Sequence, residues 1–307
     1  MKNHSMRIVM LAIATAVVMA ATAWADDLAG IGREILAKHQ DAVVAVKLAI
    51  KQSVSMGGRE NKSESKTATT GTVIDPSGLT VVSLAATDPS STIKDAYARA
   101  IAARGGDMSQ FKFDSELNDV KIVLADGTEI PAEVVLRDKD LDLAYLRPSE
   151  KPAKPLACLD LTKDAKPQVL DEVIVLNRLN QAANRASAIS IGRIEGIIDK
   201  PRTFYLLGQS MWAYSLGAPV FSADGNLIGI VLLRSSKTQT DQDSGFIFSN
   251  LNQWGMMPVI LPASDIVDGA KQAMEAKVPT TEEKSTSENK PRASEKAGPA
   301  APPAKSP

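Results

Sequence analysis

Gly71-Thr-Val-Ile-Asp-Pro-Ser-Gly78 combines a β-rich segment with a strong turn signal. Residues 70–74 are rich in β-branched side chains, which favour a strand. Asp75-Pro76-Ser77-Gly78 is typical of a tight turn, because Pro presets its own backbone angle and Gly tolerates a positive φ. Leu79 to Leu84 then forms a second apolar segment. The stretch predicts a strand, a turn and a second strand.

The same pattern of short β-rich segments and turn signals continues along most of the chain. Asp126-Gly127 and Ala223-Asp224-Gly225 are the clearest further turns. The predicted strands are residues 42–54, 120–124, 133–136, 142–146, 172–176, 188–198, 219–222 and 227–233. Many short strands separated by Gly and Asp turns favour a barrel or a sandwich, so the predicted class is all-β.

Helical spacing appears near both ends of this body and once inside it. Residues 28–39 and 264–276 are predicted helices, and the second is expected to place Ile266, Val267, Ala270 and Met274 on one face. Residues 93–104 form a helix-like insertion. Gly57 to Thr70 is polar throughout and is predicted to be a surface loop.

The two ends of the chain differ in composition from its middle. Lys2 and Arg7, an apolar stretch over residues 8–20, and Ala23-Trp24-Ala25 predict a signal peptide at residues 1–25. The apolar stretch is shorter than the roughly 20 residues that span a bilayer, so no membrane span is expected after cleavage.

Residues 279–307 consist mainly of Pro, Ala, Ser, Lys and Glu, and are expected to be disordered because they cannot bury enough surface to offset their ordering entropy. Residues 26–278 are then the folded domain.

Charge and cysteine content exclude several classes of function. The chain has 35 basic and 36 acidic side chains with no basic cluster, which argues against nucleic-acid binding. Its single cysteine, Cys158, cannot form an internal disulfide or a Cys/His metal cluster. We expect no metal and no cofactor.

Four motifs, in order, resemble the protease domain of the HtrA family of trypsin-like serine proteases. They are Gly71–Gly78; Val123-Leu-Ala-Asp-Gly127 with Val134-Val-Leu-Arg-Asp138 and Asp142-Leu-Ala-Tyr-Leu146; Ala188–Ile198; and Gly217-Ala-Pro219 with Asp224-Gly-Asn-Leu-Ile-Gly-Ile230. The resemblance covers residues 30 to 275 and implies a chymotrypsin-like double β-barrel with its active site between the barrels. The PDZ domain that commonly follows in this family is not expected here.

The resemblance also implies where a catalytic triad would lie. A serine nucleophile needs a histidine base and a carboxylate that orients it. Counting along the motifs places Ala85 at the histidine position, Asp142 at the aspartate position and Leu216 at the nucleophile position. Only Asp142 matches, and we expect it to be a structural, hydrogen-bonded residue. The two histidines of the chain are His4, within the predicted signal peptide, and His39, predicted to be a surface or capping residue.

Two alternatives stay open at this site. Ser215, one position before Leu216, is a weak candidate for a displaced nucleophile with a lysine base. Trp212, Tyr214, Leu216 and Gly217 are the candidate binding residues of the former cleft. The first three of them either fill the cleft as core, which is the favoured interpretation, or line an apolar groove for a peptide.

The sequence therefore favours an exported pseudoprotease, in the bacterial periplasm or outside the cell, that acts as a binding or scaffolding module for an unidentified protein or peptide. An active serine endopeptidase using Ser215 and a structural envelope protein are the alternatives. The missing pair at Ala85 and Leu216 makes a non-enzymatic role the leading expectation.

Overall fold

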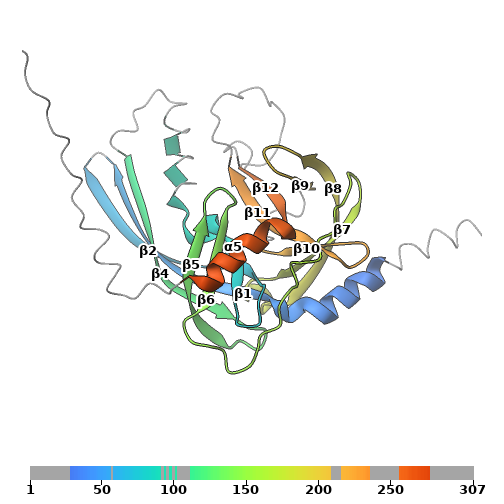
Figure 1. Cartoon of the computed structure of the whole chain (residues 1–307). Helices are drawn as coiled ribbons and strands as arrows, with labels where there is room; N and C mark the ends of the chain where they lie inside the picture. Colours follow the sequence, from blue (N-terminus) through green and yellow to red (C-terminus); the bar gives the residue numbers. More distant parts are fainter. Residues whose placement is uncertain are drawn as a thin grey trace, which may run out of the picture. The chain divides into compact units, whose positions relative to one another are not determined.

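Two closed antiparallel β-barrels make up the folded part of the chain (Figure 1). The computed structural model describes residues 28–56, 58–90, 93–94, 97–98, 101, 111–208, 216–235 and 256–276. Six strands close each barrel, and helices lie at the beginning and the end of the described chain. The predicted all-β double barrel with short terminal helices is confirmed.

The first barrel has the strand order β1-β2-β3-β6-β5-β4. Its strands are β1 (Val43–Met56), β2 (Arg59–Val73), β3 (Thr80–Ser83), β4 (Phe111–Val123), β5 (Glu129–Asp138) and β6 (Leu143–Pro148). The short helix α2 (Leu84–Thr87) follows β3 directly. A helix over residues 28–39 leads through η1 (Gln40–Ala42) into β1.

The second barrel has the strand order β10-β11-β12-β9-β8-β7. Its strands are β7 (Glu172–Arg178), β8 (Ser187–Ile198), β9 (Phe204–Leu207), β10 (Pro219–Ser222), β11 (Leu227–Ser235) and β12 (Met256–Pro262), with η3 (Gln181–Ala183) between β7 and β8. Helix α5 (Ala263–Glu275) follows β12.

Helix α5 packs back onto the barrels through a face that differs slightly from the predicted one. Ile266 and Ala270 are buried as expected, but Ala273 is buried as well, while Met274 is 47% exposed. The Arg147 guanidinium of β6 donates to the carbonyl oxygens of Ala273, Met274 and Ala276. These contacts satisfy carbonyls that the last turn of a helix leaves without a partner, which holds this end of α5 against the first barrel.

Three apolar clusters hold the two barrels. One fills the inside of the first barrel, one fills the inside of the second, and the third, which we call the interface cluster, combines residues of both barrels with residues of both terminal helices. The largest fully buried members of the interface cluster are Leu79, Leu143, Tyr145, Ile174, Leu176, Phe221 and Ile230. The barrels are therefore joined by a continuous apolar layer.

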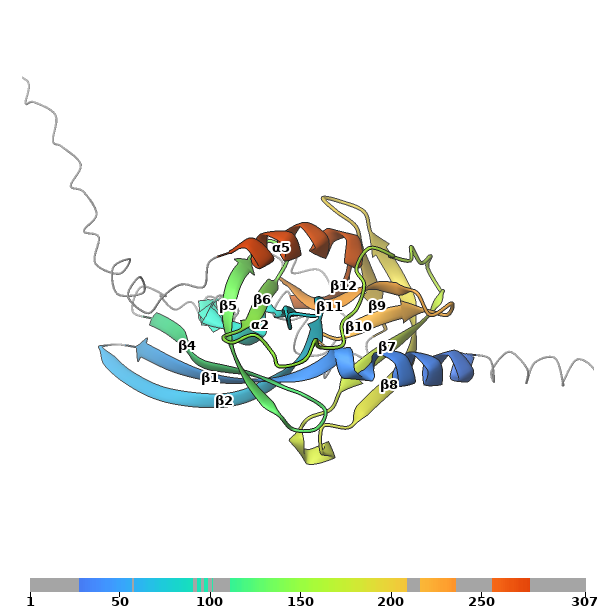
Figure 2. The ribbon, with the colours of Figure 1, turned by 60° about the horizontal axis from the view of Figure 1, so that its bottom comes forward.

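The segment predicted to be a surface loop, Gly57–Thr70, is mostly strand. β2 begins at Arg59 and pairs with β1 without interruption from Met56↔Arg59 to Val43↔Thr72. With β4, these strands extend beyond the barrel as a three-stranded arm, made of residues 50–56, 59–69 and 111–119 (Figure 2). The prediction was wrong because residues 59–68 are almost all exposed, so no alternation of buried and exposed side chains marks the strand.

The insertion predicted at residues 93–104 is helical at positions 93, 94, 97, 98 and 101, where it is described. It contacts the arm, because the Tyr97 ring stacks on the Phe111 ring with a centroid distance of 4.6 Å. Phe111 and Phe113 of β4 are both buried. The insertion therefore lies against the apolar face of the arm.

Replacing Gly229 with Ala is expected to destabilise the second barrel. A Cβ atom at Gly229 would lie 1.9 Å from the backbone oxygen of Leu261, where β11 and β12 run side by side. Backbone in a closed barrel cannot yield easily, so we expect a loss of about 2–4 kcal/mol in the free energy of unfolding. Urea denaturation followed by circular dichroism measures it.

Gly30→Ala is the matched control, because Gly30 lies in the helix of residues 28–39 and a Cβ atom added there would have no atom within 4 Å. Ala favours helix over Gly by up to about 1 kcal/mol, so this variant should be neutral or slightly more stable. Equal unfolding midpoints for the two variants would contradict the close approach of β11 and β12.

Candidate functional site

Asp142 lies where the two barrels meet. It directly precedes β6 and has a positive φ of 57°, a conformation that Asp tolerates better than most residues. Its Oδ1 atom accepts a hydrogen bond from the backbone N–H of Ala85 at 2.8 Å. Its Oδ2 atom accepts from the Ser83 hydroxyl at 2.5 Å and from the backbone N–H of Leu233 at 2.9 Å. The carboxylate therefore joins β3 and α2 of the first barrel to β11 of the second.

The charge of Asp142 is poorly compensated at this position. Desolvation by burial raises its pKa from 3.8 to about 6, and the hydrogen bonds from Ser83, Leu233 and Ala85 lower it only in part. None of the ion pairs within the described ranges involves Asp142. Around neutral pH the ionised carboxylate is therefore stabilised by these neutral hydrogen-bond donors, with no positively charged partner among the described residues.

The structure brings Ala85 and Asp142 into direct contact. Ala85 is the second residue of α2, and its backbone N–H reaches the carboxylate, while its side chain is a single methyl group. Ser83 was not singled out from the sequence, because one serine before a short apolar segment carries no pattern of its own. Its hydroxyl is completely buried, so it supports Asp142 and is closed to a substrate.

Leu216 and Gly217 are held by packing. The Leu216 side chain packs against the cluster inside the second barrel. Gly217 has a φ of 85° and donates its backbone N–H to the Val231 carbonyl at 2.7 Å, while its own carbonyl accepts from the Thr72 hydroxyl at 2.7 Å. A Cβ atom there would lie 2.0 Å from the Thr70 oxygen, so glycine is required where β2 touches the second barrel. Trp212, Tyr214 and Ser215 lie outside the described residues.

His39 is remote from this site and held in place by an aromatic contact. It precedes η1, makes no side-chain capping hydrogen bond there, and stacks on the Phe221 ring at a centroid distance of 5.3 Å. Burial and, second, the positive charge of Lys38 lower its pKa. His39, predicted to be a surface or capping residue, is half-buried and is the N-cap residue of η1, but its imidazole packs on Phe221 and makes no capping hydrogen bond. His4 lies outside the described residues.

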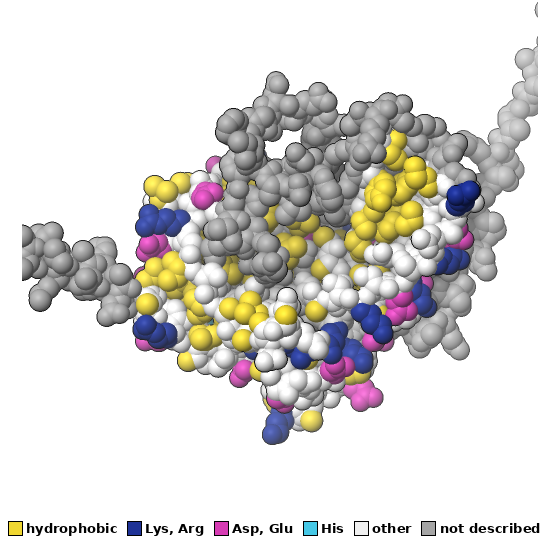
Figure 3. Space-filling model, turned by 180° about the vertical axis from the view of Figure 1, so that it is seen from behind, with side chains coloured by type: hydrophobic (Ala, Val, Ile, Leu, Met, Phe, Trp, Pro, Cys, Tyr) yellow, Lys and Arg dark blue, Asp and Glu magenta, His cyan; other side chains and the backbone are white. Residues whose placement is uncertain are grey.

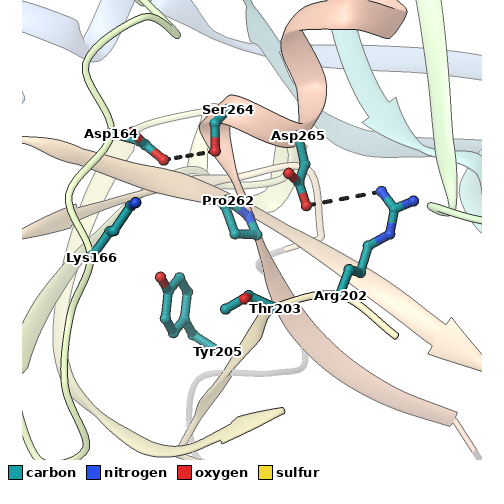
Figure 4. A pocket seen from close by; sticks show the side chains of 8 residues that line it. All are labelled: Asp164, Lys166, Arg202, Thr203, Tyr205, Pro262, Ser264 and Asp265. Carbon is teal, nitrogen blue, oxygen red and sulfur yellow. Dashed lines mark hydrogen bonds and ion pairs between the residues drawn. The ribbon is translucent and has the colours of Figure 1, made fainter. Parts of the chain in front are cut away.

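A polar pocket of about 410 Å³ lies elsewhere, beside β9, β12 and the start of α5 (Figure 4). The Arg202 Nη1 atom lies 3.9 Å from the Asp265 Oδ2 atom. The Ser264 hydroxyl donates a hydrogen bond to the Asp164 carboxylate at 2.7 Å. None of its lining residues contacts Asp142. Four of its polar side chains are thus paired with one another inside the pocket.

Other features of the described chain point to no second chemistry. No group of three or more His, Cys, Asp or Glu side chains there is arranged to hold a metal ion. No helix among the residues placed by the structure is long and apolar enough to cross a membrane. On the face shown in Figure 3, basic and acidic side chains lie next to one another, so this face has no broad field of one sign.

Asp142→Asn is expected to change how stability depends on pH. Because the pKa of Asp142 is about 6 in the folded chain and its ordinary value is 3.8, unfolding releases a proton between these values. The wild type should therefore gain about 1 kcal/mol relative to the variant as the pH falls from about 8 to about 5. At about pH 8 the variant should still be less stable by about 1–3 kcal/mol, because its amide group must face a backbone N–H.

Urea denaturation of both proteins at several pH values measures this difference, and subtraction cancels the titration of all other groups. A difference that stays constant, or one that moves in favour of the variant as the pH falls, would contradict the raised pKa.

The comparisons with known proteins agree with the architecture. The family described as "Trypsin-like peptidase domain" matches residues 69–230, which are 162 of the chain's 307 residues. The matched segment contains Ala85, Asp142, Leu216 and Gly217, and it extends over both barrels. No curated protein matches the chain significantly. With more than half of its length matched and both barrels in place, the chain belongs to the trypsin-like peptidase domain family.

Proposed function

We propose that this chain is an exported pseudoprotease that binds a protein or peptide partner without cutting it. The observation that carries the proposal is the contact between Ala85 and Asp142. In trypsin-type hydrolysis a histidine stands between the carboxylate and the serine and transfers the proton. Here the residue beside the carboxylate offers a backbone N–H and a methyl group, neither of which can act as a base.

The histidine content of the chain also supports the proposal. The chain has two, His4 and His39, and His39 stacks on Phe221. Ser83 and Asp142 form a hydroxyl–carboxylate pair that superficially resembles a nucleophile and its base. The complete burial of Ser83 argues against that role, because a peptide carbonyl has no path to its hydroxyl.

Leu216 stands at the nucleophile position implied by the resemblance, and it has no hydroxyl group. Its packing against the second barrel, together with the contact of Gly217 with β2, favours a structural role for both residues. Trp212 and Tyr214 keep the two interpretations given above, core or groove; if they line a groove, their large amphipathic side chains are the proposed partner contacts of this stretch. Within the family, the motifs around Asp126-Gly127 and Asp142 support an assignment to the HtrA type.

A cleavage and binding assay on the chain without residues 1–25 tests the proposal. Fluorescein-labelled unfolded casein is the probe, with anisotropy reporting binding and peptide release reporting cleavage. We expect binding and no cleavage, and no labelling of the protein by a fluorophosphonate. Ser215→Ala is the control variant, because Ser215 is the alternative nucleophile.

The double variant Ala85→His with Leu216→Ser extends the assay. Because Leu216 packs against the barrel core, the substitution is expected to cost about 1–3 kcal/mol, and folding of the variant is checked by circular dichroism. Gain of cleavage by this variant would support the placement of both positions. Cleavage by the parent that disappears in Ser215→Ala would overturn the proposal and make the chain an enzyme with a displaced nucleophile.

Export is the second part of the proposal and has its own test. Lys2, Arg7 and the apolar stretch of residues 8–20 support a signal that is removed after Ala25. Expression of the full chain in a bacterial host should yield periplasmic or secreted protein whose intact mass begins at Asp26. Protein that stays in the cytoplasm with residues 1–25 attached would contradict this part and leave the binding proposal untouched.

A further inference from the structure

The outer edge of β2 is open over most of the arm. β2 pairs with β1 along its whole length, but with β3 only at Thr72 and Val73. Along residues 59–69, no strand among the described residues pairs with the side of β2 that faces away from β1. Figure 2 shows β2 as the outer strand of the arm. Such an edge presents a row of backbone N–H and C=O groups to water or to another strand.

Two of the features that usually prevent pairing with another chain, proline and β-bulges, are absent from this edge. Residues 59–69 contain no proline, and the ladder between β1 and β2 has no bulge. Charged side chains are present, but their signs alternate along one face: Glu60, Lys62, Glu64 and Lys66. A run of one sign would repel a second copy of the same strand, whereas alternating signs can attract it.

Backbone geometry restricts how two copies of this edge can pair. In an antiparallel ladder, alternate residues direct their N–H and C=O groups to the same side of the strand. Even-numbered residues must therefore face even-numbered residues of the second copy, and odd must face odd. When a two-fold axis relates the two copies, the numbers of any two facing residues add up to the same even number. Neighbouring registers differ by two in this sum.

One of these registers pairs each of the four alternating charges with its opposite, while Arg59 faces Thr67. When the axis passes through Ser63, Glu60 faces Lys66 of the second copy and Lys62 faces Glu64, and the symmetry repeats both pairs. If the sum of facing residue numbers is lowered by two, Glu60 faces Glu64 of the second copy. If it is raised by two, Lys62 faces Lys66. Like charges directly opposite each other on neighbouring strands are destabilising, so the register centred on Ser63 is selected.

The side chains involved are available for such a contact. Within one chain, the Lys62 Nζ atom lies 3.3 Å from the Glu60 Oε1 atom. The Glu60 side chain is 53% exposed and the Lys62 side chain is 74% exposed. Ser53 on β1 donates a hydrogen bond to Glu60 at 2.8 Å. On the other face of β2, Asn61, Ser63 and Ser65 are small and uncharged, so they allow the two strands to approach each other.

We propose that two copies of this chain form a dimer by antiparallel pairing of their β2 edges about Ser63. The sheet β4-β1-β2 of one copy then continues into β2-β1-β4 of the other. The occupant of the open edge is a second copy because the charge pattern is complementary to itself in a single register. This dimer does not depend on whether the protein is a protease or a pseudoprotease.

Charge reversal on the folded chain without residues 1–25 tests the proposal. Glu60→Lys with Glu64→Lys makes the edge basic throughout, and Lys62→Glu with Lys66→Glu makes it acidic throughout. All four positions lie on an exposed strand, so both variants should fold like the wild type. In sedimentation velocity at low salt, the wild type should dimerise, and each variant alone should have at least tenfold weaker dimerisation.

Mixing the two variants is the control, because variants that were only destabilised would not recover dimers when mixed. Every position of the basic edge then faces an opposite charge on the acidic edge, so an equimolar mixture should recover dimers, and high salt should weaken them. A wild type that stays monomeric at low salt would overturn the proposal. So would dimers that survive in both single variants, or a mixture that stays monomeric.

A disulfide crosslink tests the register directly. In a Cys158→Ser background, Ser63→Cys should form a symmetric disulfide under mild oxidation, because facing residues of paired strands lie within disulfide reach. Ser53→Cys is the matched control, since Ser53 lies on β1, one strand away from the edge. Equal crosslinking of both variants, or none in Ser63→Cys, would contradict pairing centred on Ser63.

Discussion

Burial of the interface cluster fixes how the two barrels pack against each other and where their connecting residues lie. Along β6, Leu143 and Tyr145 point into this cluster, while Ala144 and Leu146 point into the first barrel. β7 divides in the same way between the interface and the second barrel. These strands are buried on both faces, which removes apolar surface from water on each side and ties the position of one barrel to the other.

Asp142 occupies the place that this packing creates. Because Leu143 is fixed in the interface cluster, the carboxylate before it reaches α2 in its own barrel and the Leu233 N–H in the other. The same burial that orients the carboxylate makes its charge costly, and three hydrogen bonds only partly compensate. In an active protease this arrangement supports a histidine. In this chain the carboxylate accepts a hydrogen bond from the backbone N–H of Ala85, whose side chain is a methyl group.

Sequence reasoning succeeded where burial leaves a pattern and failed where it does not. β6, β7 and β11 are nearly continuous apolar segments and were predicted, as were the terminal helices from their helical spacing. The end of β2 was predicted as a strand, but its residues 59–69 were missed, because residues 59–68 are almost all exposed and are held by backbone bonds to β1, which side-chain patterns do not reveal. In the same way, Ala273 replaced Met274 on the buried face of α5, because the packing of that helix against β6 selects the face.

Local sequence patterns were enough to predict most of the strands and turns and the likeness to a trypsin-like domain. These follow from local propensity and from residue identity. Long-range packing, by contrast, places Ser83 and Leu233 against Asp142, requires glycine at Gly217 because Thr70 lies against it, and leaves the outer edge of β2 unpaired among the described residues. Each of these depends on segments far apart in the chain, and long-range packing, unlike periodicity, leaves no local signal.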